Sequence, residues 1–106
     1  MTEQEFLALA ERTLRSIEDA LDACDAPVET SLSGPVLELE FDDGGKIIVN
    51  GNAPLREIWV AAKSGGFHFR READRWLDTR SGDELFQSLS RLVSQQGGRP
   101  VVLGDA

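Results

Sequence analysis

The order of predicted elements along the chain indicates an α+β fold, a two-layer α/β sandwich with two helices packed on one face of a single antiparallel β-sheet. A helical pattern occupies the N-terminus, short alternating segments fill the middle, and a second helical pattern follows them. Each element has one apolar face to bury, and two helices side by side on the same face of the sheet bury all of these faces. The other face of the sheet is then open to solvent, as antiparallel sheets allow.

The first helix is predicted to begin at Thr2, because Thr2 and Glu5 have the T-x-x-E spacing of a capping box. Pro27 restricts the residue before it, so the helix is expected to end near Asp25. At 100° per residue, one stripe must face the core. Its members are Phe6, Ala10, Thr13, Ile17, Leu21 and Cys24. An acidic stripe lies roughly 130° away. It holds Glu11, Glu18, Asp22 and Asp25, with Arg15 among them and Asp19 beside it.

The middle of the chain is predicted to form antiparallel strands, because apolar and polar residues alternate there. Residues 36–50 contain VLELEF and KIIVN joined by DDGG, a pattern typical of a hairpin. Further strands are expected at residues 57–62, 67–70 and 75–78, and a short one at 28–32.

A second helix is predicted after these strands. Ser81 and Glu84 repeat the capping-box spacing, and Gly97–Gly98 supplies the end of the helix. Its apolar face consists of Leu85, Phe86, Leu89, Leu92 and Val93. Residues 99–103 are expected to be an extended tail that covers a helix or a sheet edge.

Negative charge is concentrated near the N-terminus. The net charge is −8, and residues 1–29 hold eight acids against two arginines, a balance of −6. The remaining 77 residues hold eleven acids and nine bases, a balance of −2. An acidic domain repels phosphate backbones, so we expect no nucleic-acid partner. A cation or a basic protein surface is the natural complement.

Composition also limits the class of protein. The chain has no repeat and no linker, so we expect a single domain over residues 1–106. One cysteine excludes an intramolecular disulfide and fits a reducing compartment. No apolar run reaches membrane-spanning length, and the N-terminus lacks the pattern of a signal peptide. We therefore expect a cytoplasmic protein that makes no contact with a membrane.

Carboxylates crowd the last turns of the first predicted helix, and residues 16–25 contain no Lys or Arg. Like charges three or four residues apart destabilise a helix by about 0.2–0.5 kcal/mol per pair. Acids near a helix C-terminus also oppose the helix dipole, at roughly 0.3–1 kcal/mol each. Three interpretations remain open: a solvated face, a weak and exposed site for hard cations bound through oxygen, and a docking face for a basic protein.

No catalytic arrangement is present in the sequence. His68 stands alone between two phenylalanines and fits a structural or surface histidine, and Cys24 falls on the core stripe. The glycine pairs lie at predicted turns and a helix end, and none belongs to a phosphate-binding loop pattern. We therefore expect that the protein is not an enzyme.

The segment EIWVA predicts a tryptophan on the open face of the sheet. Alternation makes Ile58 and Val60 the core pair. Glu57, Trp59 and Ala61 then point to the other face. Tryptophan is enriched at interface hot spots, so Trp59 is a candidate for partner binding unless a loop or the C-terminal tail covers it.

These segments give the chain a resemblance to a known family. KIIVN, A-PLREIWVA, GGFHF and W-D-RSG resemble the signature of the frataxin family, specifically its bacterial CyaY branch. I-E-D-x-L-D-x-x-D in the first helix matches the same branch, and the resemblance spans essentially the whole chain. It implies the two-layer sandwich predicted above and a role in iron–sulfur cluster assembly.

The resemblance also implies the residues of two sites. One is an acidic ridge that binds Fe²⁺ or Fe³⁺ weakly, and other divalent or trivalent cations can substitute for iron there. On this sequence the acidic ridge consists of Glu18, Asp19, Asp22, Asp25 and Glu29. The other is a sheet surface with Asn50 and Trp59, which implies docking on the complex of cysteine desulfurase and iron–sulfur scaffold protein. Bacterial relatives often carry more acids in the segment that here reads APVETSLSG, a departure that bears on how many cations bind and on how readily iron drives oligomerisation.

The leading hypothesis is an iron-binding regulator or adaptor of iron–sulfur cluster assembly, a monomer that can oligomerise with iron. The alternative is an iron-storage or detoxification protein, oligomeric and ferroxidase-like. No E-x-x-H pair, typical of a ferroxidase site, occurs in the sequence. A third hypothesis is an acidic interaction domain with incidental metal affinity.

Overall fold

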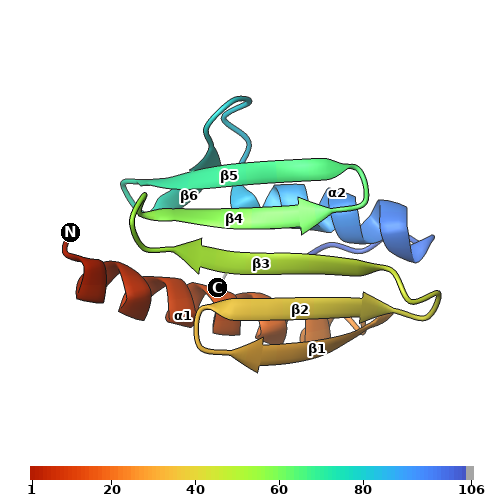
Figure 1. The fold of residues 1–106 in the computed structure, drawn as a ribbon. Helices are drawn as coiled ribbons and strands as arrows, with labels where there is room; N and C mark the ends of the chain where they lie inside the picture. The colour runs from red at the N-terminus through yellow and green to blue at the C-terminus, as the bar shows by residue number, and fades with distance from the viewer. Residues whose placement is uncertain (105–106) are drawn as a thin grey trace.

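A computed structural model describes residues 1–104 and has two layers, a sheet and a pair of helices (Figure 1). The six strands are antiparallel and follow one another in chain order across the sheet. The elements are α1 (Glu3–Ala23), β1 (Val28–Ser33), β2 (Val36–Phe41), β3 (Lys46–Asn52), β4 (Glu57–Ala62), β5 (Gly65–Glu72), β6 (Arg75–Asp78) and α2 (Leu85–Gly97). Both helices lie on the same face of the sheet. The predicted fold class is confirmed.

Alternation along the strands fills the core, as the sequence predicts. Eight inward apolar residues of β2 to β5 are at most 4% exposed, and they are Leu37, Leu39, Phe41, Ile47, Val49, Ile58, Val60 and Phe69. The strand expected at residues 28–32 is present as β1, and β5 is longer than the predicted 67–70. Neither helix within residues 1–104 combines the length and hydrophobicity needed to cross a membrane.

The predicted capping box starts α1. The Thr2 hydroxyl accepts a hydrogen bond from the Glu5 amide at 3.1 Å, and the Thr2 amide donates to the Glu5 carboxylate at 2.7 Å. The predicted core stripe is buried except for Cys24, which follows the last helical residue and is only half-buried. Leu14 joins the buried face, because the stripe a helix buries is wider than one row of side chains.

The helix α1 packs tightly against the sheet at a glycine of β3. A Cβ atom on Gly51 would lie 3.0 Å from the Cβ of Ala10 and 3.5 Å from the ring of Phe6. The absence of a side chain at Gly51 and the small side chain of Ala10 therefore set how near α1 can lie to the strands.

A buried tryptophan at the far edge of the sheet also contacts α1. The Trp76 indole packs edge-on against Phe6, with ring centroids 6.0 Å apart. Its N–H donates to the Thr13 hydroxyl at 3.3 Å, and that hydroxyl donates to the Leu9 carbonyl at 2.8 Å. Both polar groups are thus satisfied inside the core, as buried polar groups must be.

The predicted start of the second helix is wrong. The N-cap of α2 is Glu84, whose side chain accepts from the Gln87 amide at 3.1 Å, and Ser81 lies in the preceding turn. That turn is organised by Asp78, whose carboxylate accepts from the Ser81 amide at 3.2 Å. An isolated bridge between Leu77 and Glu84 keeps the chain extended up to the cap. This tertiary pairing overrides the local S-x-x-E signal.

The end of α2 and the tail agree with the prediction. Gly98 adopts the left-handed conformation with φ 75° at the C-cap. The tail then lies along α2, with Val101 and Leu103 buried. The Ser94 hydroxyl accepts from the Val101 amide at 2.8 Å, and the Ser90 hydroxyl accepts from the Leu103 amide at 2.9 Å. Residues 101–103 of the tail therefore lie on the helical side of the sheet.

We expect Thr13→Val to destabilise the fold by about 1–2 kcal/mol, because it leaves the buried Trp76 indole N–H without an acceptor. Thr13→Ser keeps the hydroxyl and serves as the matched control. Urea unfolding followed by circular dichroism measures both variants. Equal stability of Thr13→Val and the native chain would contradict a structural role for this hydrogen bond.

Candidate functional site

Three acids of the predicted acidic ridge gather where α1 meets β1. Glu18, Asp22 and Asp25 line a shallow hollow of about 140 Å³, together with Thr30 of β1. The Glu18 carboxylate accepts a hydrogen bond from the Thr30 hydroxyl at 3.2 Å. We call this group of three carboxylates the acidic hollow. It is open to solvent and offers oxygen atoms, the ligands that hard cations prefer.

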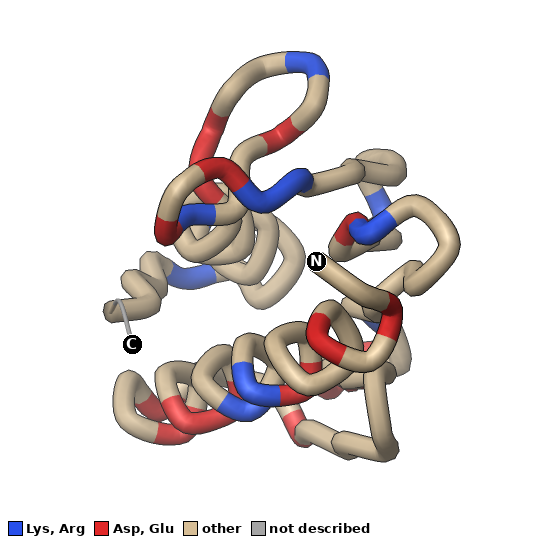
Figure 2. Tube along the Cα trace, turned by 90° about the vertical axis from the view of Figure 1, so that its left-hand side faces the viewer, with Lys and Arg blue, Asp and Glu red and all other residues tan. Residues whose placement is uncertain are grey.

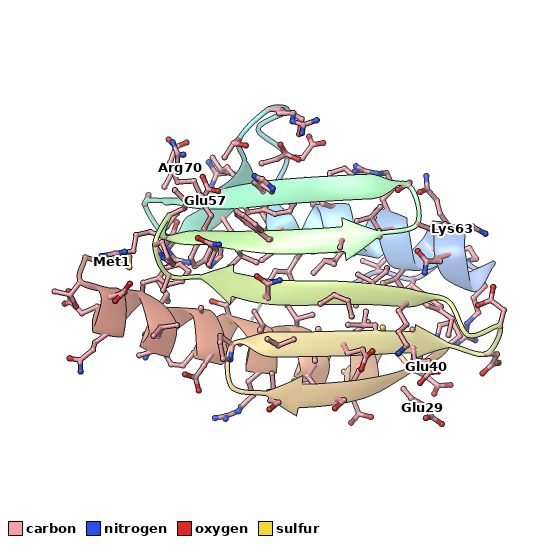
Figure 3. All side chains as sticks on the ribbon, in the orientation of Figure 1. Met1, Glu29, Glu40, Glu57, Lys63 and Arg70 are labelled. Carbon is pink, nitrogen blue, oxygen red and sulfur yellow. The ribbon has the colours of Figure 1, made fainter. Side chains whose placement is uncertain are left out.

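The structure places the other two ridge residues elsewhere. Asp19 lines a separate hollow with Cys24, which follows α1, and Val102 of the tail. Glu29 pairs with Glu40 across β1 and β2, and its neighbours along β1 point toward the helices, so Glu29 points to the open face (Figure 3). Within residues 1–104, no three His, Cys, Asp or Glu side chains are arranged to hold one metal ion together.

The end of α1 is electrostatically unfavourable for the acids that it carries (Figure 2). Its last turn has no basic residue. The chain leaves the helix through hydrogen bonds from Ala26 to the Leu21 carbonyl at 3.0 Å and from Asp25 to the Asp22 carbonyl at 3.2 Å. This is a Schellman motif with Asp25 at φ 52°, where glycine is usual. Arg99 of the tail donates to the backbone carbonyl of Asp25. This hydrogen bond satisfies a backbone group and does not neutralise the carboxylates.

The two predicted partner-binding residues are neighbours on the open face. Asn50 of β3 lies directly opposite Trp59 of β4, and Trp59 lies opposite His68 of β5. Val36 of β2 pairs with Asn50 and extends the row across the sheet. We call these four residues the transverse row. The placement of Trp59 on the open face is confirmed, whereas its role in binding a partner stays a prediction.

Trp59 is held by its neighbours rather than covered by the tail. Its indole ring stacks on the His68 ring, with centroids 4.4 Å apart and planes 7° apart. Its indole N–H donates to the Glu57 carboxylate at 3.0 Å. The second Glu57 oxygen accepts from Arg70 at 2.7 Å, and His68 Nδ1 lies 3.7 Å from the first. We call Glu57, Trp59, His68 and Arg70 the Glu57 cluster (Figure 3 labels Glu57 and Arg70).

Sequence reasoning missed the burial of Glu57. Alternation sends this side chain to the open face, yet it is 4% exposed. Arg70 lies directly opposite Glu57 in the β4–β5 pairing, and Trp59 follows two residues later on the same face. An acid two residues before a tryptophan, with an arginine across the hairpin, is the signal that could have predicted it.

Comparison with known proteins places the chain in a family. The profile described as "Frataxin-like domain" matches residues 1–99. The chain belongs to the frataxin family. The iron-sulfur cluster assembly protein CyaY of Janthinobacterium sp. (strain Marseille) is 59% identical over 111 residues, covering 100% of this chain and 99% of its own. The protein of that name from Cupriavidus pinatubonensis is 56% identical over 108 residues, covering 98% and 97%.

Solved frataxin structures share this fold. A frataxin from Psychromonas ingrahamii, of the CyaY protein family, matches with a TM-score of 0.91 at 32% identity over 99% of this chain and 100% of its own. A trimeric frataxin from Saccharomyces cerevisiae, complexed with ferrous iron, matches with a TM-score of 0.67 at 25% identity over 93% and 88%. The resemblance seen in the sequence is therefore confirmed.

The Glu57 cluster of this frataxin-family chain keeps its carboxylate charged. Burial alone would raise the pKa of Glu57. Hydrogen bonds from Trp59 and Arg70, with the charge of Arg70 and the proximity of His68, outweigh burial and hold the pKa of Glu57 below its usual value. The carboxylate form is thus the one that the surrounding groups are arranged to bind.

We expect Glu57→Gln to destabilise the chain by about 1–2 kcal/mol near neutral pH, because it breaks a charge-assisted bond at a buried position. A depressed pKa contributes stability above the unfolded-state pKa of about 4.3, and this is lost as pH falls through the folded pKa. The difference between native and variant should therefore shrink below about pH 4.3. Urea unfolding at several pH values measures it, and a difference independent of pH would contradict this account.

Proposed function

We propose that this chain is a non-enzymatic regulator or adaptor of iron–sulfur cluster assembly that binds iron weakly and docks on the cysteine desulfurase–scaffold complex. The observation that carries the proposal is the set of carboxylates at the C-terminal end of α1, retained without basic partners in the last turn. Relatives at 56% and 59% identity are named iron-sulfur cluster assembly proteins, which supports the pathway.

The acidic hollow is the proposed contact for Fe²⁺ or Fe³⁺. Glu18, Asp22 and Asp25 offer hard oxygen donors around one shallow hollow. Asp19 lies about one helical turn before Asp22 on α1. A yeast frataxin was solved in complex with ferrous iron, which supports iron as the cation. Exposed and loosely arranged carboxylates favour weak binding with little selectivity among divalent and trivalent cations. Glu29, on the open face, would bind only in a separate contact.

The transverse row is the proposed contact for the protein partner. It combines an amide, Asn50, with the aromatic ring of Trp59 on a face that neither helix covers. Interfaces use such aromatic residues as anchors, with polar neighbours that set orientation. The acidic hollow and the transverse row lie on different layers of the molecule, so iron and a partner can bind together.

Storage and detoxification of iron by an oligomer is the second candidate function. The observation that supports this candidate is a yeast frataxin that is trimeric and complexed with ferrous iron. Storage requires an assembly that holds many metal ions per chain. Analytical ultracentrifugation and iron analysis after aerobic loading separate the two functions, since a regulator is expected to stay small and to bind few ions.

We expect millimolar divalent cations to raise the melting temperature, because they relieve repulsion within the acidic hollow. Asp22→Lys should raise the melting temperature of the metal-free chain by roughly 3–8 °C, for the same reason and because a cation suits the helix C-terminus. Differential scanning calorimetry measures both effects. Glu72→Lys makes the same charge change away from α1 and controls for net charge. No response to cations or to Asp22→Lys would count against the acidic hollow as a cation site.

The function itself is tested by a time course of cluster assembly with cysteine desulfurase, scaffold protein, cysteine and limiting ferrous iron. We expect the native chain to change the rate and Trp59→Arg to abolish the change, because a bulky charge disrupts the transverse row. Gln87→Arg places the same side chain on α2, where Gln87 is exposed and far from both proposed contacts, and should act like the native chain. Slower assembly would identify an inhibitor, and faster assembly an iron donor or activator. An unchanged rate with the native chain would refute the proposal.

A further inference from the structure

Glu57 is the only buried charged residue among residues 1–104, and the acidic hollow does not use it. It lies on the open face, where a carboxylate could have remained in water. Removing a carboxylate from water is costly unless it gains partners. Its burial therefore indicates that its contacts, rather than solvation, determine where it lies.

The Glu57 cluster is a block of two cross-strand pairs. Glu57 lies opposite Arg70, and Trp59 lies opposite His68. Arg70 binds one carboxylate oxygen of Glu57 at 2.7 Å, and the other oxygen accepts from the Trp59 indole at 3.0 Å. Each carboxylate oxygen therefore accepts a hydrogen bond from a different residue. One contact fixes Glu57 itself, and the other fixes the tryptophan.

The Trp59 ring is restrained by two independent contacts. Stacking on His68, at 4.4 Å and 7°, restrains the tilt of the ring. Stacking alone tolerates a flip of the indole about its Cβ–Cγ bond, because the opposite face of the ring can stack on an imidazole equally well. The hydrogen bond to Glu57 removes this freedom, because it requires the indole N–H to point along β4 toward the carboxylate.

We propose that Glu57 is a positioning residue for partner docking: its carboxylate orients the Trp59 indole against His68, so that the partner meets a preformed aromatic surface. The inference rests on the proposed function, since it concerns the same docking face. It adds a residue that makes no contact with the partner itself, being buried, and acts through Trp59.

Preorganisation determines the size of the expected effect. Ordering a mobile interface side chain on binding weakens association by an amount that corresponds to roughly 2- to 12-fold in affinity. In the native chain that ordering has already occurred on folding. Without Glu57, we expect Trp59 to sample several orientations, and binding would then have to select one of them.

The experiment compares Glu57→Ala, Glu57→Gln and Thr13→Val with the native chain. Glutamine keeps one oxygen that can accept from the indole, so Glu57→Gln tests rescue by a conservative change. Thr13 is buried on the helical side of the sheet, and Thr13→Val is expected to lose similar stability without touching the open face. It therefore controls for global destabilisation.

Two measurements are made on each variant. The first is ¹⁵N relaxation of the Trp59 indole N–H in the free chain. The chain has two tryptophans, and the buried Trp76 indole provides an internal reference in the same spectrum. The second is the dissociation constant for the cysteine desulfurase–scaffold complex.

We expect Glu57→Ala to increase indole mobility at Trp59 but not at Trp76, and to weaken binding about 3- to 10-fold. Glu57→Gln should lie between Glu57→Ala and the native chain, and Thr13→Val should bind within twofold of native. Native-like binding by Glu57→Ala, or equal weakening by Thr13→Val, would overturn the positioning role alone. Failure of the native chain to bind would overturn the proposed function, and this inference with it.

Discussion

The structure depends on one constraint: both helices lie on the same face of the six-stranded sheet, so only that face is covered. The apolar residues of every strand must then point the same way, which the alternation in β2 to β5 achieves. The opposite face becomes available for polar and aromatic side chains that packing does not require. The transverse row and the Glu57 cluster occupy that face. Binding chemistry can therefore vary on one side of the sheet while the core on the other side is preserved.

The acidic hollow shows a different relation between stability and function. Packing of α1 depends on its buried stripe, so the solvent side of its last turns is free to carry carboxylates that repel one another. The helix ends through Asp25 in the left-handed conformation, although glycine would be less strained there. A sequence selected for stability alone would replace these acids, and stabilising changes at functional sites commonly cost activity. The tail stabilises this helix end, because Arg99 donates a hydrogen bond to the backbone carbonyl of Asp25.

Most of the fold could be predicted because it follows from local periodicity. Alternation located β2, β4 and β6 at the observed residues, and the Thr2 capping box located the start of α1. The differences from the sequence prediction arise from pairing between extended segments, which the periodicity of one segment does not encode. The bridge from Leu77 to Glu84 moves the start of α2, and the pairing of Glu29 with Glu40 places Glu29 on the open face, away from the acidic hollow. The burial of Glu57 follows from the register of β4 and β5, which the turn and not the alternation determines.

The chain order of the strands has a kinetic consequence. Every strand pairs with the strand next to it in sequence, so each pairing closes a short loop, and short closures cost little entropy. The contact of Trp76 with Thr13 instead joins residues 63 positions apart and requires that the strands between them be in place. We infer that pairing of the hairpins limits the folding rate, and that α1 docks after this step. Kinetic φ-values from folding rates of mutants test this order. We expect high values in the β3–β4 and β4–β5 hairpins and values near zero at Trp76, and a high value at Trp76 would contradict the order.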